Sequence, residues 1–399
     1  MGETPLDRWK RYRAVVEREP LPCALVDLDA VEANVDALVR PLQGTGKTLR
    51  VATKSVRCPD LVRRILARAG SVAQGLMTYT AAETAFWVEE GQRDLLLAYP
   101  VTRPLDAGLV ATANATGATA AVVVDCVQHL ELLSAAARER GTRIPVMIEL
   151  DVAWRPLGSV MHIGVRRSPV RSAPDVVALA RRATATEGLT FHGVMAYEAQ
   201  IAGLGDTGAA VRAMKAASRR NVEKVRADVA DALARAGLKA KVFNGGGTGT
   251  VSSCAREPAL TEVTAGSGFV DSHLFDAYRG LALQAAAFFA LAIVRRPREG
   301  VVTCHGGGYV ASGGAGPHRL PIPALPAGLK LLSLEGAGEV QTPLELGPGV
   351  SLSLGDPVFF RHAKAGELAE HFSEYLLVRG VHVEARAPTY RGLGRCFLG

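Results

Sequence analysis

Eight short apolar runs, each followed by an amphipathic stretch, constrain the fold of this chain more than any other feature. The runs are nearly continuous rather than alternating, which is typical of strands buried on both faces of a parallel sheet. The stretches between them are rich in alanine, leucine and arginine and predict helices. Eight such units in about 250 residues favour a closed (β/α)8 barrel over an open doubly wound sheet. The predicted strands lie at residues 23–28, 48–53, 72–76, 95–99, 121–125, 144–150, 190–196 and 241–244.

The pattern of apolar and turn-forming residues changes after residue 275. Short apolar runs there are separated by glycine and proline, and the stretch PHRLPIPALPAG cannot be helical. We therefore expect an α/β protein with a TIM-like barrel over residues 22–275 and a mostly β C-terminal domain over residues 276–399. The N-terminal segment, residues 1–21, contains a predicted helix that we expect to pack on the C-terminal domain.

Charge and composition argue against several classes of function. The net charge of +7 comes from arginines scattered over predicted helices, and only 6% of residues are aromatic, which does not fit nucleic-acid binding. The longest apolar run, residues 285–294, is too short to span a bilayer, and the first residues carry no apolar signal core. The six cysteines form no CxxC pair, which favours reduced thiols. We expect a cytoplasmic protein without nucleic-acid or membrane partners.

Lys54 is the first candidate for chemistry. It ends a predicted strand and comes just before an amphipathic stretch opened by Pro59 and Asp60. An amine there lies at the carboxyl end of a strand, where parallel α/β proteins hold their active sites. A partly desolvated lysine can form a Schiff base with an aldehyde. The alternative is an ordinary solvated loop lysine.

Two glycine-rich loops are candidate phosphate sites. NGGGTGT, residues 244–250, directly follows a predicted strand, and its Gly246, Gly247 and Thr248 offer backbone N–H groups and a hydroxyl. It is neither a Walker sequence nor a GxGxxG fingerprint, so a tight structural turn is the alternative. TAGSGF, residues 264–269, is a second small-residue loop in which Gly266 and Ser267 could hold the same group.

Further polar residues fall on the predicted carboxyl rim of the barrel. Tyr197 and Glu198 end one strand, while Arg155 lies at the rim of another with His162 close behind. An arginine at this rim would suit a carboxylate or a phenolate. The alternatives are a half-buried core tyrosine and salt bridges along the rim.

His362 follows a predicted strand of the C-terminal domain. Lys364, Glu367 and His371 are near it in sequence, so a metal site is conceivable. The spacing matches no recognised ligand pattern, and a hydrogen-bonded structural histidine is the alternative.

Several motifs in a consistent order resemble the pyridoxal-phosphate enzymes of the alanine-racemase fold, called fold type III. The resemblance is strongest to the branch of D-threonine aldolases, D-serine dehydratases and amino acid deaminase/aldolase proteins. It implies that Lys54 holds the cofactor aldehyde, that the two glycine loops hold its phosphate, and that Tyr197 faces its ring. The motifs cover nearly the whole chain: CALVDLDAVEANV, RVATKSVRC, HIGVRRSP, MAYEAQIAG, NGGGTG, TEVTAGSG and FFRHAKAGEL.

The sequence departs from this family pattern at two places. The family has an Arg-x-Gly-Val element near the phenolic oxygen of the cofactor, and His162 stands at the matching place. The relatives carry His-x-Cys or His-x-Asp as a metal pair, whereas this chain reads His362-Ala363-Lys364. A divalent metal is therefore left open, and Lys364 is a candidate to put an ammonium where the relatives place the ion.

The resemblance implies a lyase that acts on a β-hydroxy amino acid of D configuration, by retro-aldol cleavage or by dehydration. Lys54 would serve as general base, and His362 or a metal-bound water would handle the proton of the β-hydroxyl. An amino-acid racemase or epimerase and a non-enzymatic pyridoxal-phosphate-binding protein are the alternatives. The resemblance also implies a homodimer.

Overall fold

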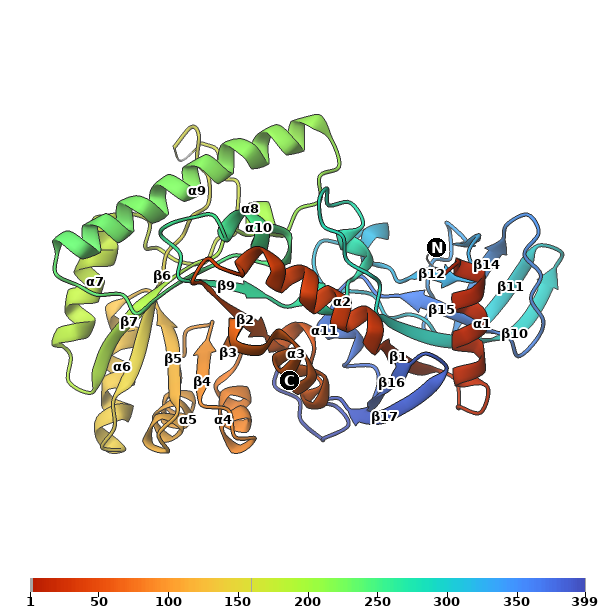
Figure 1. Ribbon diagram of the computed structural model, residues 1–399, viewed down its shortest axis with the longest axis horizontal. Coiled ribbons are helices and arrows are strands. Elements are labelled where there is room, and N and C mark those ends of the chain that lie inside the picture. The colour runs from red at the N-terminus through yellow and green to blue at the C-terminus, as the bar shows by residue number, and fades with distance from the viewer. Residues whose placement is uncertain (1–2, 159, 399) are drawn as a thin grey trace.

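The computed structural model describes residues 3–158 and 160–398. Figure 1 shows two parts along the long axis, a barrel wrapped in helices and a twisted, mostly antiparallel sheet beside it. The expected combination of a TIM-like barrel and a mostly β sheet is confirmed. Among the described residues, no helix is both long and apolar enough to cross a membrane.

The barrel is a closed ring of parallel strands, β2 to β9, paired in sequence order. Apolar side chains such as Leu96, Val123 and Met147 pack against one another inside the barrel. The strands are β2 (Thr48–Ala52), β3 (Ala73–Thr78), β4 (Asp94–Leu97), β5 (Thr119–Val124), β6 (Ile144–Glu149), β7 (Leu189–Ala196), β8 (Val242–Gly245) and β9 (Glu262–Ala265).

The prediction that residues 23–28 form the first barrel strand is wrong. Strand β1 (Cys23–Asp27) instead pairs with β10 and β16 in the second sheet. The ring is closed by β9, which pairs with β2 and β8 and was not predicted as a strand. Its interior side chains are polar: Glu262 accepts hydrogen bonds from Arg50 at 2.7 Å and from Asn244 at 2.8 Å. Because the interior contacts of β9 are polar, the strand has no apolar run that would have predicted it from the sequence.

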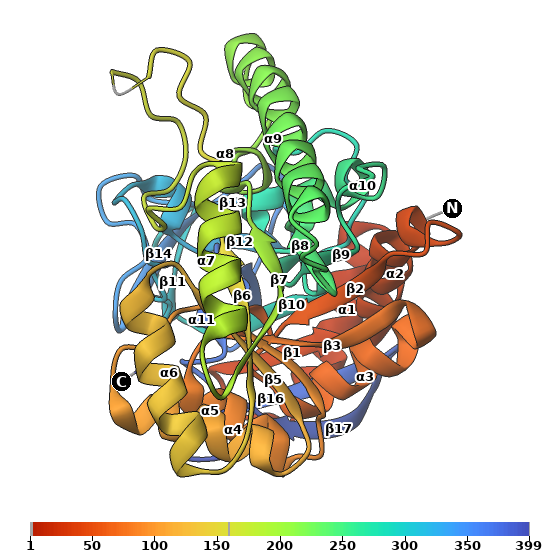
Figure 2. The same ribbon diagram turned by 90° about the vertical axis from the view of Figure 1, so that its left-hand side faces the viewer.

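Helices cover the outside of the barrel, and several begin at clear sequence signals. Ser172 caps α7 in a reciprocal capping box with Asp175, and Thr80 accepts from the backbone of Glu83 at the start of α4. The long helix α9 runs along one side and projects past the barrel (Figures 1 and 2). The helices are α2 (Leu28–Val39), α3 (Pro59–Ala69), α4 (Ala81–Glu89), α5 (Pro104–Ala115), α6 (Val127–Glu139), α7 (Ala173–Ala185), α8 (Ala199–Ala202), α9 (Ala209–Arg235) and α10 (Val251–Cys254).

The second sheet has the order β13-β14-β11-β10-β1-β16-β17, with β15 pairing β10 and β12. Helix α1 (Pro5–Val16) packs on it, where Trp9 donates to the carbonyl of Pro357 at 3.0 Å and Tyr12 donates to Asp27 at 2.7 Å. The division at residue 275 into independent domains stays a prediction. The remaining strands are β10 (Ala287–Arg298), β11 (Val301–His305), β12 (Ile322–Leu325), β13 (Leu329–Leu331), β14 (Gln341–Leu346), β15 (Pro357–Arg361), β16 (Glu374–Arg379) and β17 (His382–Pro388).

The two parts meet at the turn that carries Lys54. The short helix α11 (Ala365–Leu368) packs against this turn so closely that a Cβ added to Gly366 would lie 1.7 Å from the carbonyl oxygen of Lys54. Arg57 donates to the same oxygen at 2.9 Å and forms an ion pair with Glu370 at 2.5 Å. The second part therefore forms one wall of the space above the barrel.

Candidate active site

A cavity of about 1020 Å³ opens at the carboxyl ends of the barrel strands. Both parts of the molecule line it, and most of the predicted site residues are among the lining residues. They are Lys54, Tyr197, Gly246, Gly247, Thr248, Gly266 and Ser267. Arg155, His162 and His362 do not line it.

Lys54 lies in a short 3-10 turn, Thr53–Ser55, directly after β2. Its Nζ donates a hydrogen bond to the hydroxyl of Tyr99 at 3.0 Å. Burial opposes ionisation of this phenol, but the charge of Lys54 and its hydrogen bond outweigh burial and hold the pKa of Tyr99 below its usual value. The amine is thus oriented by a partner that can exchange a proton with it.

Sequence reasoning missed Tyr99, although the signal was available. The residue ends the predicted strand at 95–99, and Tyr197 likewise comes at the carboxyl end of its strand. A polar aromatic residue at the carboxyl end of a barrel strand is a candidate for the site on that ground alone.

The two glycine loops pack so closely on neighbouring residues that side chains in place of their glycines would collide with them. A Cβ on Gly247 would lie 3.0 Å from Ala202, one on Gly266 would lie 2.9 Å from the Ser55 hydroxyl, and one on Gly268 would lie 2.5 Å from Thr248. Gly246 has a φ of +88°, which favours glycine. The Thr248 hydroxyl accepts from the backbone of Gly268 at 3.0 Å, so the two loops are tied together.

Glu198 holds the first glycine loop from behind rather than facing the cavity. It accepts the backbone N–H of Gly246 at 3.1 Å and the hydroxyl of Thr250 at 2.5 Å. It also pairs with the fully buried Arg226, which reaches Glu257 at 2.7 Å. Burial opposes ionisation, yet Arg226 and these hydrogen bonds keep the pKa of Glu198 below its ordinary value.

Tyr197 extends from the end of β7 into the cavity. Burial raises the pKa of its phenol to about 12, so the ring stays neutral. The guanidinium of Arg167 lies over this ring, 5.7 Å from its centroid. Both residues line the cavity wall, and Arg167 offers it a fixed positive charge.

Arg155 and His162 are held in the loop between β6 and α7, away from the cavity. Arg155 pairs with Asp151 at 2.5 Å, and a ring nitrogen of His162 lies 3.1 Å from the carbonyl oxygen of Val165. The loop folds back on itself through a bridge between Trp154 and Ile163, which turns both side chains aside. Arg167, further along the same loop, reaches the cavity instead.

His362 is enclosed behind the cavity wall, with 3% of its surface exposed. Among the described residues, neither of its ring nitrogens has a hydrogen-bond partner. Burial, followed by the charges of Arg361 and His273, lowers its pKa to about 3. The imidazole is therefore neutral.

The cavity wall is strongly basic. Among its lining residues, Glu367 is the only carboxylate. The cationic or titratable basic groups are Lys54, Arg57, Arg167, His273, His318, Arg319 and Lys364. This imbalance attracts anionic ligands.

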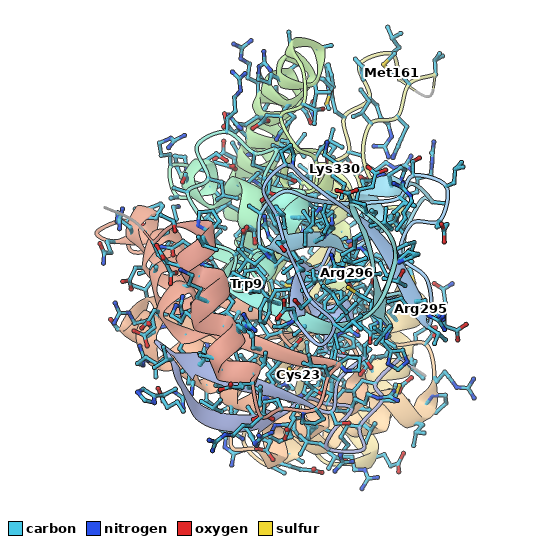
Figure 3. The ribbon with its side chains drawn as sticks, turned by 90° about the vertical axis from the view of Figure 1, so that its right-hand side faces the viewer. Trp9, Cys23, Met161, Arg295, Arg296 and Lys330 are labelled. Carbon is cyan, nitrogen blue, oxygen red and sulfur yellow. The ribbon has the colours of Figure 1, made fainter. Side chains whose placement is uncertain are left out.

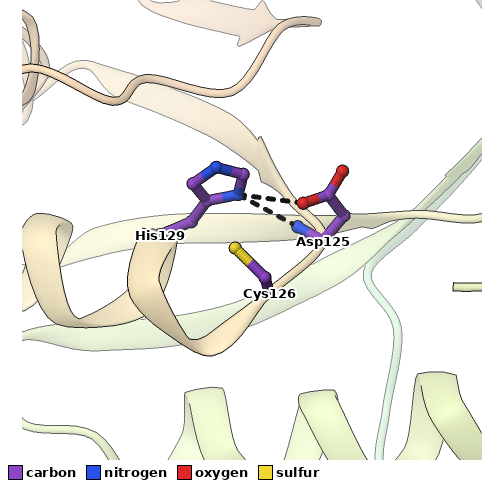
Figure 4. Close-up of side chains that lie close together, drawn as sticks. All are labelled: Asp125, Cys126 and His129. Carbon is purple, nitrogen blue, oxygen red and sulfur yellow. Dashed lines mark hydrogen bonds and ion pairs between the residues drawn. The ribbon is translucent and has the colours of Figure 1, made fainter. Parts of the chain in front are cut away.

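A separate group of ligating side chains lies at the carboxyl end of β5. The ligand atoms of Asp125, Cys126 and His129 lie within 4.8 Å of one another, and Nδ1 of His129 is 3.1 Å from the Asp125 carboxylate (Figure 4). Sequence reasoning missed this group, whose signal is DCxxH directly after a strand.

Glu149, at the end of the neighbouring strand β6, is a buried carboxylate beside this group. The register pairs Val124 with Ile148, so Asp125 and Glu149 follow at adjacent positions of the two strands. Burial raises the pKa of Glu149, and with Arg167 lowering it and Asp125 and Asp151 raising it the net value is about 7.

A closed parallel barrel with a lysine and two glycine loops at its carboxyl rim defines the class of protein, a TIM-barrel protein with a rim site. The chain belongs to the family described as alanine racemase, N-terminal domain, whose model matches residues 26–270.

The chain is similar to proteins of known activity. A 3-hydroxy-D-aspartate aldolase of Paracoccus denitrificans is 29% identical over 252 residues, which cover 63% of this chain and 60% of the relative. The chain thus matches less than two thirds of the length of its curated relatives. The crystal structure of a D-threonine aldolase from Filomicrobium marinum has a TM-score of 0.81 at 22% identity, covering 94% of this chain and 95% of that one.

A D-threo-3-hydroxyaspartate dehydratase shares the fold as well. A cysteine-to-alanine mutant of it, in the metal-free form, has a TM-score of 0.75 at 20% identity and covers 94% of this chain and 98% of that one. Another of its solved structures is a histidine-to-alanine mutant, changed two positions earlier in the chain.

Proposed function

We propose that the protein is a pyridoxal-phosphate-dependent lyase acting on β-hydroxy D-amino acids. The observation that carries this proposal is that the Lys54 amine lies in one cavity with two glycine loops at the carboxyl rim of the barrel. The aldolases and the dehydratase to which the chain is similar support the reaction class.

The residues present fit the cofactor. Lys54 would hold its aldehyde, and the loops of Gly247, Thr248 and Gly266, which line the cavity, would offer backbone N–H groups and a hydroxyl to its phosphate. Tyr197 would lie against the ring, and Arg167 would replace His162 as the partner of the phenolic oxygen.

The cofactor, when bound, supplies an electron sink for the bonds of the substrate α-carbon. The side chains of the protein determine which proton of the substrate is transferred. With the cofactor and substrate bound, the Nζ of Lys54 would be the base that takes the α-proton. Tyr99, within hydrogen-bond distance of that nitrogen, orients it and can return its proton.

We propose that the substrate carries a second anionic group, as in D-3-hydroxyaspartate. Arg319 and His318 line the cavity on the side of the second sheet, where one carboxylate, Glu367, faces several basic groups. Two of the similar proteins are named for hydroxyaspartate substrates, which supports this class. The test compares kcat/KM for D-3-hydroxyaspartate and D-threonine, and a preference for D-threonine would contradict it.

A divalent metal does not fit this site. His362, the predicted metal ligand, does not line the cavity, and the residue two positions later is a lysine. We therefore propose a site without a metal, and no step is assigned to one.

The cofactor proposal is tested by substitution of Lys54. The wild-type protein is expected to show a visible chromophore that borohydride reduces onto the chain, and peptide mapping should find the adduct at Lys54. Lys54→Ala should lose the adduct and at least about 100-fold in rate. Lys330→Ala, an exposed lysine on β13, is the control. An adduct at another lysine in Lys54→Ala would contradict the proposal.

We also propose that the protein is a cytoplasmic homodimer. The six cysteines are free, which supports a reducing compartment. The loop after β6 exposes Leu157 and Val160, with 61% and 85% of their surfaces open to solvent, which supports a partner surface.

A further inference from the structure

Lys364 is fixed at the cavity by a short polar network. It follows β15 and directly precedes α11. Its Nζ donates to the Ser312 hydroxyl at 2.8 Å and lies 3.7 Å from Glu367. Ser312 in turn donates its backbone N–H to Glu367 at 2.7 Å and its hydroxyl to the other carboxylate oxygen. An ammonium has three donors, so this network orients Lys364 and leaves donor capacity for a ligand in the cavity.

The turn that carries Lys364 packs directly on the turn that carries Lys54. Gly366 leaves no room for a side chain beside the Lys54 carbonyl, and Arg57 bridges the two segments. The amines of Lys54 and Lys364 both line the cavity. Two amines, from Lys54 and Lys364, therefore face the same cavity from adjoining turns.

We infer that Lys364 is the general acid for the β-hydroxyl, so that the protein is a metal-independent dehydratase. This inference rests on the proposed function and narrows it. Lys54 takes the α-proton, the electron pair of the Cα–H bond forms the Cα=Cβ double bond, and the Cβ–O bond breaks. The proton of Lys364 goes to the leaving oxygen, which departs as water. The product enamine takes up water and gives a 2-oxo acid and ammonia, Lys54 releases the α-proton to solvent, and solvent reprotonates Lys364.

The same network is poorly suited to carbon–carbon cleavage. Retro-aldol cleavage requires a base that removes the proton of the β-hydroxyl. The candidate carboxylate on the cavity wall is Glu367, and Ser312 donates to both of its oxygens. Burial opposes its ionisation, but these hydrogen bonds and the charges of Lys364 and Arg57 hold the pKa of Glu367 below its usual value. A carboxylate stabilised in this way is a weak base.

The first experiment measures metal in the purified holoenzyme. We expect less than stoichiometric zinc or manganese and an unchanged rate after chelator treatment. Because Asp125, Cys126 and His129 could hold an ion elsewhere, His129→Ala is analysed in parallel. Stoichiometric metal that persists in His129→Ala, or a rate that chelation abolishes and metal restores, would overturn the inference whichever reaction the protein catalyses.

The second experiment compares Lys364→Met with Lys330→Met, a lysine exposed on the second sheet and labelled in Figure 3. With D-3-hydroxyaspartate and D-threonine, the wild type should form a 2-oxo acid and ammonia. Lys364→Met should lose at least about 100-fold of this rate, and the control should not. Glycine plus an aldehyde as the products, or full rate in Lys364→Met, would overturn the inference.

Exchange of the α-proton separates this inference from the proposed function. D-Aspartate has no β-hydroxyl, so its α-proton exchange in heavy water needs Lys54 but not Lys364. We expect Lys364→Met to retain that exchange together with the cofactor chromophore. Absence of exchange in the wild type would refute the proposed function instead. Ser312→Ala, which removes the hydroxyl that holds Lys364, should give a smaller loss of elimination with exchange intact, and equal loss of both would contradict the role.

Discussion

At the scale of single residues, the site depends on how burial and neighbouring charge set protonation. Tyr99 and Tyr197 are both tyrosines at strand ends, yet the pKa of the first is lowered beside Lys54 and that of the second is raised by burial. Glu149 and Glu198 are both buried glutamates, yet only Glu198 has an arginine partner at hydrogen-bond distance. Residues of the same type on one barrel rim therefore differ in pKa, because their surroundings differ.

Glu149 gives the protein a pH-dependent stability. Its pKa is about 7 in the folded protein against an ordinary 4.5, so its contribution to stability is full below pH 4.5 and is lost as the pH rises through 7. Glu149→Gln should remove this loss. The wild type should lose ~1–3 kcal/mol more of its free energy of unfolding between pH 5 and pH 8 than the variant does. Denaturant unfolding at both pH values measures it.

The exposed Glu139→Gln on α6 is the matched control and should leave the pH dependence unchanged. A pH dependence in Glu149→Gln equal to that of the wild type would mean that Glu149 ionises in the folded protein as freely as it does in water.

At the scale of elements, the short helix α11 connects the second part of the molecule to the cavity. It brings Lys364 to the cavity and lies on the turn of Lys54, and that contact requires a residue without a side chain at Gly366. In the barrel, Arg226 from α9 and Glu198 from the end of β7 anchor the glycine loop after β8. Elements distant in sequence thus set the positions of both ends of the proposed cofactor site.

Gly366→Ala should damage the site, because its Cβ would lie 1.7 Å from the Lys54 carbonyl oxygen. The two turns must move apart, and we expect weaker cofactor retention and a loss of about 1–3 kcal/mol in stability. Gly108→Ala in α5 is the control, since nothing lies within 4 Å of its Cβ. That change should be neutral or stabilising by up to about 1 kcal/mol. Cofactor absorbance after gel filtration measures retention, and equal behaviour of both variants would refute the contact.

At the scale of the whole molecule, the cavity belongs to neither part alone. The barrel supplies Lys54 and the glycine loops, and the second part supplies Arg319 and Lys364. Strand β1 also lies in the second sheet, so the chain enters that sheet before it builds the barrel. The two parts are therefore expected to unfold together.

The homodimer is tested at this scale. The exposed loop after β6 stands away from the barrel, and Figure 3 places Met161 at its end. Light scattering should give twice the chain mass of 42.0 kDa, and Leu157→Ser with Val160→Ser should shift the protein toward the monomer. Arg181→Ser on the exposed face of α7 is the control. A monomeric wild type would contradict the proposal.

The sequence by itself determined the barrel, the mostly β second part and the placement of Lys54 and the glycine loops at one rim, because strand period and strand-end position are local properties. Tertiary structure decided what depends on distant partners. An apolar run such as β1 is compatible with either sheet, and polar β9 becomes a strand because Arg50 and Asn244 satisfy Glu262 inside the barrel. Likewise, only tertiary packing encloses His362 and leaves Lys364 facing the cavity. The two residues are close in sequence, but different parts of the structure surround their side chains.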